Sequence, residues 1–206
     1  MKLKNEYKKI AAEYDSWAEN YEKDALYKFK YVTPQKMAKK VLPLVKKGQT
    51  ILELGCGTGL NSVFYHKNGC KLFGVDLSRK SLKEAAKKGT YESLRFGNIE
   101  DRLRFDDEQF DGVLCVGVLS DIKDPSPLIK EMRRVVKSKG YIAFTSCPTP
   151  VSECYEHSLS EIRTYLKENN LRIRDSFKFR SHFALPTAGR SVPLIPIFYW
   201  GIICQK

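Results

Sequence analysis

The 206-residue sequence predicts a single α/β domain built on a doubly wound, mostly parallel sheet. Apolar segments of strand length alternate with helical segments between residues 50 and 146. Three glycines at alternate positions, Gly55, Gly57 and Gly59, follow the first of these strands. The next strand ends in Asp76, about 20 residues after the first glycine, the spacing at which dinucleotide folds place an acid that binds ribose hydroxyls. Together these features favour an adenosyl-type ligand.

The first predicted element is a helical segment over residues 6–28 that is rich in aromatic side chains. Tyr14, Trp17 and Tyr21 recur at spacings of three and four, which places them on one helix face. Such a stripe packs against the core or covers a binding site, and the pattern alone leaves both interpretations open. A second helix is expected from Pro34 to about Lys46. Residues 1–47 therefore form a helical cap, and residues 48–206 form the core of the single domain.

The core follows as strands and helices whose ends carry turn and capping signals. Ser78 is placed as the N-cap of one helix, and Gly89 ends it. Ser158 and Glu161 form a capping-box pattern for the last helix. The segment from Ser181 to Pro196 contains three prolines and is expected to be a loop over the substrate side. The predicted strands span residues 50–54, 71–76, 92–96, 110–116, 141–146, 171–179 and 197–204, and the core helices span 59–67, 78–88, 125–137 and 158–170.

Composition narrows the classes of function. The net charge is +12, but the lysines are spread over the predicted helices, which favours a solvated surface over a nucleic-acid strip. Six cysteines occur without a C-x-x-C pair, so no metal site is expected and a reducing compartment is indicated. The N-terminus is charged, and the longest apolar run, Val192–Trp200, is short and broken by prolines. We therefore expect a cytoplasmic protein that does not span a membrane.

The glycine loop indicates which adenosyl ligand is bound. It lacks both the G-x-G-x-x-G spacing of pyrophosphate sites and the G-K-[ST] end of a P-loop. Glu53 stands just upstream, where a carboxylate disfavours phosphate and suits a ligand that carries an ammonium group. The stretch from Glu53 to Gly59 resembles the E-x-G-x-G-x-G motif of class I S-adenosylmethionine-dependent methyltransferases. The resemblance covers residues 7–146, is nearest to the methyltransferase type 11/12 small-molecule group, and continues through Asp76 and residues 97–101, 110–119, 124–125, 128–137 and 139–144.

This resemblance implies a seven-stranded Rossmann-like methyltransferase fold with an antiparallel C-terminal strand and an N-terminal helical lid. In that family Asp76 would bind the ribose diol, Leu77 would pack on the adenine, and Asn98 and Ile99 would recognise its edge. The segment from Tyr14 to Tyr21 resembles the Y-D-x-W-A-x-x-Y lid of small-molecule methyltransferases. The resemblance implies these residues for binding S-adenosyl-L-methionine: Tyr14, Tyr21, Glu53, Gly55, Cys56, Gly57, Gly59, Asp76, Leu77, Asn98, Ile99 and Val116.

The expected chemistry is direct in-line transfer of a methyl group to a small-molecule acceptor. Because alignment supplies much of such catalysis, a base is needed only for a nucleophile that is protonated at working pH. His157 and His182 are candidates for that base, and both are also explained as polar residues on a loop rim. The alternatives are an RNA or ribosomal methyltransferase, a cofactor-binding interaction protein without turnover and, more distantly, a dehydrogenase. The sequence predicts neither the acceptor nor the oligomeric state.

Overall fold

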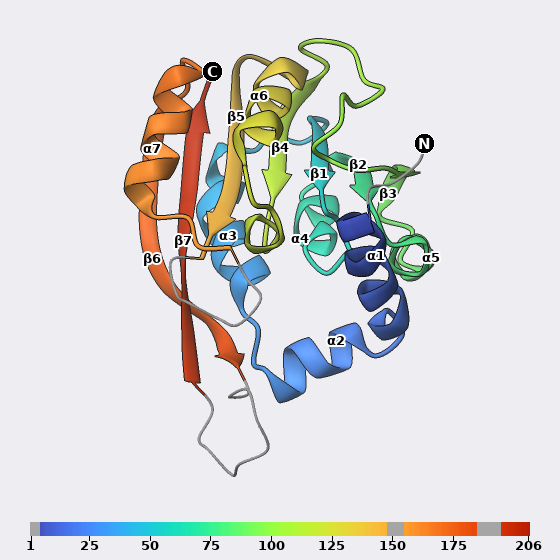
Figure 1. Cartoon of the computed structure of the whole chain (residues 1–206). Helices are drawn as coiled ribbons and strands as arrows, with labels where there is room; N and C mark the ends of the chain where they lie inside the picture. The colour runs from blue at the N-terminus through green and yellow to red at the C-terminus, as the bar shows by residue number, and fades with distance from the viewer. Residues whose placement is uncertain (1–4, 148–154, 185–194) are drawn as a thin grey trace.

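The computed structural model describes residues 5–147, 155–184 and 195–206. A seven-stranded sheet runs through the centre of the molecule with helices on both faces (Figure 1). The strands are β1 (Thr50–Leu54), β2 (Lys71–Asp76), β3 (Tyr91–Phe96), β4 (Phe110–Cys115), β5 (Val136–Ser146), β6 (Arg172–Ala184) and β7 (Ile195–Gln205). The principal helices are α1 (Asn5–Trp17), α2 (Tyr21–Lys23), α3 (Thr33–Val41), α4 (Ser62–Lys67), α5 (Arg79–Lys87), α6 (Ser126–Val135) and α7 (Leu159–Glu168).

The strand order is β3-β2-β1-β4-β5-β7-β6. The first five strands in this order pair in parallel, and β7 pairs antiparallel with both β5 and β6. The predicted fold class, including the antiparallel C-terminal strand, is confirmed. β1 lies between β2 and β4, so the chain leaves β1 toward one side of the sheet and later returns to the other. Such a switch point opens a crevice at the carboxyl ends of the strands.

The strands are buried on both faces because their alternate side chains enter two separate cores. In β1, Ile51 joins a cluster with Met37 and Val41 of α3, whereas Leu52 joins a cluster with Ile129 of α6. This arrangement accounts for the continuous apolar runs of the inner strands, which are typical of a parallel sheet covered by helices. Packing in the two cores fixes the positions of β1 and β2, so their carboxyl ends lie at the crevice.

Residues 6–28 are largely helical, but the prediction that Tyr14, Trp17 and Tyr21 share one helix face is wrong. Helix α1 ends at Trp17, a turn follows, and α2 continues into a π-helical turn, η1 (Asp24–Lys28). The backbone N–H of Asn20 donates to the Trp17 carbonyl at 2.9 Å, and the Trp17 indole donates to Asp24 at 2.7 Å. These bonds fold the chain back on itself, so Tyr14 and Tyr21 belong to different elements and do not share one helix face.

Other boundaries also differ from the sequence prediction. Helix α3 ends at Val41 rather than near Lys46, and β5 begins at Val136 rather than at residue 141. Helix α4 begins at Ser62 rather than at residue 59, because Gly55, Gly57 and Gly59 all adopt positive φ and form a turn. Strands β6 and β7 extend into the predicted loop of residues 181–196, and residues 185–194 of that loop lie outside the described part of the chain. In the described ranges, no helix has the length and apolar character needed to cross a membrane.

Candidate functional site

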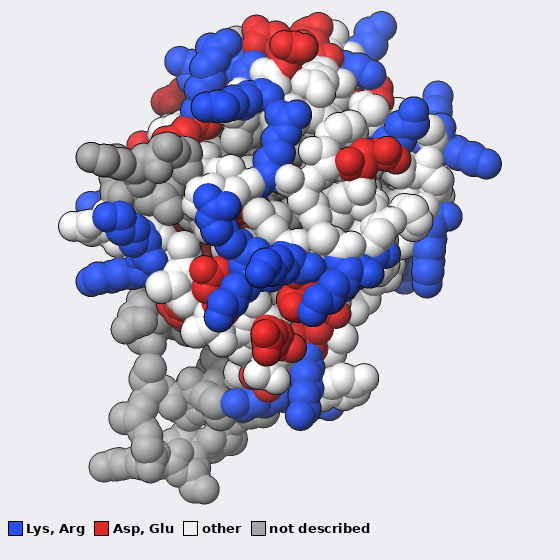
Figure 2. All heavy atoms as spheres, turned by 90° about the vertical axis from the view of Figure 1, so that its right-hand side faces the viewer, with Lys and Arg blue, Asp and Glu red and all other residues white. Residues whose placement is uncertain are grey.

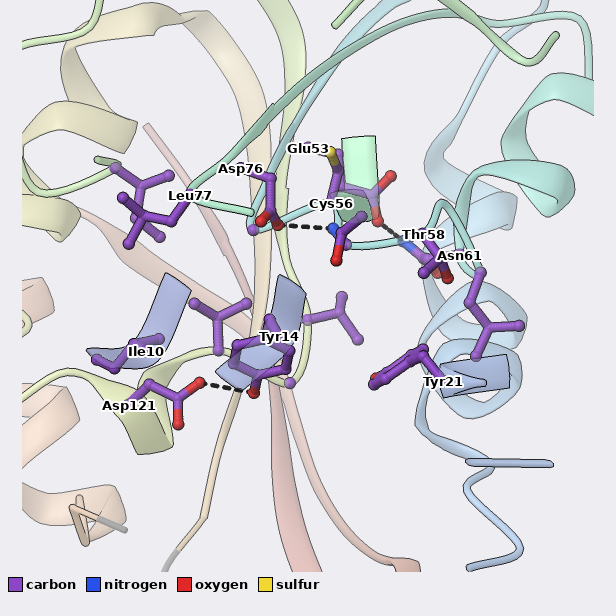
Figure 3. A pocket seen from close by; sticks show the side chains of 18 of the residues that line it. Ile10, Tyr14, Tyr21, Glu53, Cys56, Thr58, Asn61, Asp76, Leu77 and Asp121 are labelled. Carbon is purple, nitrogen blue, oxygen red and sulfur yellow. Dashed lines mark hydrogen bonds between the residues drawn. The ribbon is translucent and has the colours of Figure 1, made fainter. Parts of the chain in front are cut away.

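A pocket opens at the carboxyl ends of β1, β2 and β4, and residues of α1 and α2 line its other side. Figure 3 shows side chains that line this pocket. Its empty space is about 950 Å³, including the open mouth. In Figure 3, Glu53 and Asp76 lie at one end, and Tyr14 and Asp121 lie together at the other. The described residues on its wall are Tyr7, Ile10, Tyr14, Tyr21, Tyr31, Pro34, Glu53, Gly55, Cys56, Gly57, Thr58, Leu60, Asn61, Asp76, Leu77, Ser81, Asn98, Ile99, Glu100, Val116, Gly117, Val118, Asp121 and Ile122.

The three glycines of the loop serve different purposes. A Cβ on Gly57 would meet no protein atom within 4 Å, so this residue leaves space open at the pocket wall. A Cβ on Gly55 would lie 2.4 Å from the Val118 side chain, so packing against Val118 requires glycine at position 55. Gly59, expected to contact the cofactor, is not on the wall. Its missing side chain instead makes room for Tyr91, 3.1 Å from a Cβ placed there.

Asp76 connects the tip of β2 to the glycine loop. One carboxylate oxygen accepts a hydrogen bond from the Gly57 N–H at 2.7 Å, and the other accepts from the Ser78 N–H at 2.8 Å. Burial raises the pKa of the Asp76 carboxyl, and these backbone bonds oppose that shift. The carboxylate is therefore held rigidly at the pocket wall, with further lone pairs that can accept hydrogen bonds from a ligand.

Glu53 is 3% exposed and lies beside the same loop. It accepts hydrogen bonds from the Tyr91 hydroxyl at 2.6 Å and from Asn61 Nδ2 at 3.1 Å. Burial raises the pKa of Glu53 to about 7. The amide oxygen of Asn61 is buried and has no hydrogen-bond partner among the described atoms. A buried carboxylate and an unsatisfied amide oxygen next to one another are suited to a donor-rich cation such as an ammonium group.

Sequence reasoning missed Asn61, although its position two residues beyond the last glycine was a usable signal. It also missed Tyr7 and Ile10, which α1 brings to the wall. The residues expected to surround the adenine, Leu77, Asn98 and Ile99, all line the pocket. Asn98 Oδ1 accepts from the Glu100 N–H at 3.1 Å, which fixes the orientation of its amide.

The cap is fastened to the core by side chains of α1 and α2. Asp15 accepts hydrogen bonds from the Ser78 hydroxyl at 2.6 Å and from the Lys80 N–H at 2.9 Å. Glu22 accepts from the Thr58 hydroxyl at 2.7 Å and pairs with Lys88. These contacts hold Tyr14 and Tyr21 over the pocket, as the lid resemblance implies.

The other end of the pocket centres on Asp121, at the end of the short helix η3 (Leu119–Asp121). The Tyr14 hydroxyl donates to Asp121 Oδ2 at 2.9 Å. Burial raises the pKa of Asp121 to about 6, and the bond from Tyr14 opposes this shift. Tyr31 lies nearby, with its hydroxyl where a Cβ of Gly117 would otherwise be. Sequence reasoning did not select Asp121.

The structure places neither candidate histidine on the pocket wall. His157 is buried and its Nε2 lies 2.8 Å from the Ile122 carbonyl, so this nitrogen is used to hold the backbone. His182 contacts the Tyr31 ring, and its Nδ1 lies 2.8 Å from the Ser181 hydroxyl. Burial also lowers the pKa of His182. Neither histidine thus lines the described pocket, and the role of a base for His157 or His182 stays a prediction of the sequence.

The charges on the wall are all of one sign. The described wall residues include the carboxylates of Glu53, Asp76, Glu100 and Asp121 and no lysine, arginine or histidine. This negative wall contrasts with the net charge of the whole chain, which is +12.

Within the described ranges there is no group of three or more His, Cys, Asp or Glu side chains that could hold a metal ion. The five described cysteines are buried free thiols, and burial raises the pKa of Cys56 on the wall.

Comparison with known proteins agrees with this geometry. A family model described as a methyltransferase domain matches residues 52–144. An uncharacterized methyltransferase of Schizosaccharomyces pombe is 32% identical over 176 residues, covering 78% of this chain and 59% of that protein. A ubiquinone biosynthesis O-methyltransferase of Nitrosomonas europaea is 30% identical over 102 residues, covering 48% of this chain and 43% of that protein. This chain thus spans less than two thirds of the length of either relative.

Solved structures share the fold at low sequence identity. Magnesium protoporphyrin IX methyltransferase from Synechocystis, solved with bound SAH, superposes with a TM-score of 0.74 at 16% identity, covering 98% of this chain and all of that one. A SAM-dependent methyltransferase from Methanosarcina mazei gives 0.66 at 18% identity, covering 81% of this chain and 96% of that one. These structures show the shared fold. The match of residues 52–144 to the methyltransferase-domain model and the sequence relatives, with the glycine loop and the Asp76 position, identify the chain as a member of the class I S-adenosylmethionine-dependent methyltransferases.

Proposed function

We propose that this protein transfers a methyl group from S-adenosyl-L-methionine to a small-molecule acceptor. The observation that carries the proposal is the pocket wall, which presents four carboxylates and no described cationic side chain. S-adenosylmethionine carries a sulfonium and an ammonium, so such a wall attracts it. A pyrophosphate-containing dinucleotide would meet repulsion at the same place.

The described residues fit this cofactor along its length. Asp76 would accept hydrogen bonds from the ribose hydroxyls, and Glu53 with Asn61 would bind the ammonium. Leu77, Asn98 and Ile99 would enclose the adenine. When bound, S-adenosylmethionine supplies a methyl group that passes to the acceptor's lone pair as the carbon–sulfur bond breaks and its electrons remain on sulfur. The protein's part is to align the acceptor, which supplies up to roughly 7–11 kcal/mol in favourable cases.

A small molecule is favoured as the acceptor because the cap covers the pocket. Aromatic and apolar side chains of α1 and α2 surround the end opposite Glu53. Among the relatives, those named for ubiquinone biosynthesis are O-methyltransferases, which supports a small acceptor here as well. On the face shown in Figure 2, Lys and Arg side chains are distributed widely and accompanied by acidic ones. This pattern supports a solvated surface over an RNA path. A cytoplasmic location stays a prediction of the sequence.

Calorimetric titration with S-adenosylmethionine, S-adenosylhomocysteine and NAD tests the cofactor assignment. We expect the first two to bind and NAD to give no binding heat. Incubating the protein with labelled methyl donor and separated small-molecule and RNA fractions of a cell extract then tests the acceptor class. Label in the small-molecule fraction is expected. Label confined to RNA would support the rival enzyme class, and tight cofactor binding with no transfer would support a binding protein without turnover.

A further inference from the structure

Asp121 lies at the end of the pocket opposite Glu53, the acceptor end, where the methyl acceptor would bind. It is half-buried, and its described hydrogen-bond donor is the neutral hydroxyl of Tyr14, 2.9 Å away. The ion pairs of the described residues do not include Asp121. A carboxylate removed from water without a positive partner is costly, so its presence on a ligand-binding wall points to a ligand that supplies the charge.

The groups around Asp121 come from several elements, and those that act on its charge are acidic or neutral. Glu13 and Tyr14 lie on α1, Asp76 is at the tip of β2, and Tyr21 lies on α2. The next residue of its own segment, Ile122, is bonded through its carbonyl to His157 from the segment after β5. Lys123, which follows, is exposed. Burial, with a smaller contribution from the repulsion of Glu13 and Asp76, raises the pKa of Asp121 to about 6, and the hydrogen bond from Tyr14 opposes this shift.

Three tyrosine rings complete this end of the pocket. Tyr14, Tyr21 and Tyr31 all lie on the wall, and burial raises the pKa of each phenol, so all three are neutral at physiological pH. The faces of neutral aromatic rings attract cations, most strongly at desolvated sites. Ile10, Pro34 and Ile122 add apolar surface to the same wall.

We propose that the methyl acceptor is a primary or secondary amine on a small apolar or aromatic body, and that Asp121 binds its protonated nitrogen. In this assignment Asp121 is also the base of the reaction. One N–H bond of the ammonium breaks, the proton forms an O–H bond on the Asp121 carboxylate, and the electron pair stays on nitrogen to attack the methyl group. The inference rests on the proposed function and names the acceptor class for that same site.

The negative charge of Asp121 favours an amine over the other common classes of methyl acceptor. A carboxylate or a phenolate acceptor would bring a second negative charge beside Asp121, with no described cation on the wall to offset it. An alkylammonium, whose pKa in water resembles the value of about 10.4 for lysine, arrives with the complementary charge. Burial raises the pKa of the carboxyl and lowers that of the amine, so the two approach each other and the proton can pass.

Binding to the complex with S-adenosylhomocysteine tests this inference without requiring turnover. Three probes of one shape are titrated by calorimetry: phenethylamine, 2-phenylethanol and phenylacetate. The amine is expected to bind at least about tenfold more tightly than the alcohol, and the carboxylate is expected not to bind. The substitution Asp121→Asn keeps the shape of the side chain and should lower the amine affinity at least about tenfold, with the alcohol affinity unchanged. Asp124→Asn, at an exposed position three residues away, is the matched control and should bind all probes as the unmodified protein does.

Each outcome decides the proposal. Equal or tighter binding of the alcohol or the carboxylate, an amine that does not bind, or an Asp121→Asn variant with unchanged amine affinity would overturn it. Failure of S-adenosylhomocysteine to bind would instead overturn the proposed function, so the two failures are distinct. As a second readout, the amine affinity should rise as pH increases through about 6, where Asp121 ionises, and Asp121→Asn should remove that rise.

Discussion

The two ends of the pocket are built in different ways. At the cofactor end, Glu53 and Asp76 lie at the carboxyl ends of β1 and β2, and the glycine loop follows β1. Backbone N–H groups hold the Asp76 carboxylate. At the acceptor end, Tyr14 and Asp121 are 107 residues apart in sequence and meet through one bond between side chains. The first end is therefore a property of the sheet, whereas the second depends on how the cap packs on it.

This difference predicts where substitutions act. A change at the cofactor end should weaken binding of S-adenosylmethionine for every acceptor. A change at the acceptor end should alter which acceptor binds and leave the cofactor affinity nearly intact. The same architecture can therefore take different acceptors by changing the cap and η3 while the strand ends stay the same.

The largest expected effect comes from Asp76→Ala. It removes a carboxylate that would accept two hydrogen bonds from the ribose, each worth about 1.5–3 kcal/mol when charge-assisted. It also removes the anchor of the Gly57 N–H. The affinity for S-adenosylhomocysteine should fall at least about 100-fold by calorimetry. Asp121→Asn at the other end should change it by less than about threefold, and equal losses in the two variants would contradict the separation of the ends.

The affinity for S-adenosylmethionine should depend on pH through Glu53 at the cofactor end of the pocket. Glu53 has a pKa of about 7 in the free protein, above its ordinary value of 4.5, so it is mostly protonated below that pH. An ammonium favours the ionised form, and binding must then release a proton. The affinity for S-adenosylmethionine should therefore fall by up to about tenfold per unit as pH drops below about 7. Proton release is measured by calorimetry in buffers of different ionisation enthalpy.

The control for this profile is Glu53→Gln. This variant should bind S-adenosylmethionine more weakly at about pH 8, and its affinity should no longer depend on pH. The stability of the variant also tests the direction of the Glu53 pKa shift. Because the folded pKa of Glu53 lies above the unfolded value, the free energy of unfolding loses a contribution as pH rises from about 4.5 to 7. The glutamine variant should escape that loss. An unchanged slope in the variant would assign the pH dependence to another group.

Two glycines of one loop offer a contrast within the cofactor end. Gly57→Ala should cost only the strain of a positive φ, about 1–2 kcal/mol, but its methyl group would enter the pocket and lower cofactor affinity about tenfold or more. Gly59→Ala should lower the free energy of unfolding more, because its Cβ would lie 3.1 Å from the Tyr91 ring. Denaturant unfolding and calorimetry of both variants measure the two effects. The reverse ranking in both measurements would show that the roles assigned to these glycines are exchanged.

The smallest expected effect concerns the fastening of the cap. Glu22→Gln weakens the bond to Thr58 and removes the ion pair with Lys88, both of which are partly exposed, so the cost should be below about 1 kcal/mol. Cofactor affinity should fall less than about fivefold, mainly through faster dissociation in stopped-flow measurements. A loss as large as that of Asp76→Ala would mean that the cap contributes to the cofactor end directly.

Most of the fold and the cofactor end were predictable because their signals are local. Strand and helix order, the Ser78 cap and the Asp76 position depend on residues close in sequence, and the structure agrees with them. The break after Trp17 was not predictable, because it depends on a bond to Asp24 that competes with helical periodicity. Asp121 was missed for a similar reason. Its importance comes from burial beneath α1 and a bond to Tyr14, which is 107 residues away in the sequence.

The central claim is that the acidic, glycine-lined end of this pocket binds S-adenosylmethionine. The most direct test is a crystal structure of the protein with S-adenosylhomocysteine. We predict the ribose hydroxyls on Asp76, the amino group beside Glu53 and Asn61, and the sulfur facing the Tyr14–Asp121 pair. A ligand bound outside this pocket, or bound in it with the adenine at the Asp121 end, would contradict the account.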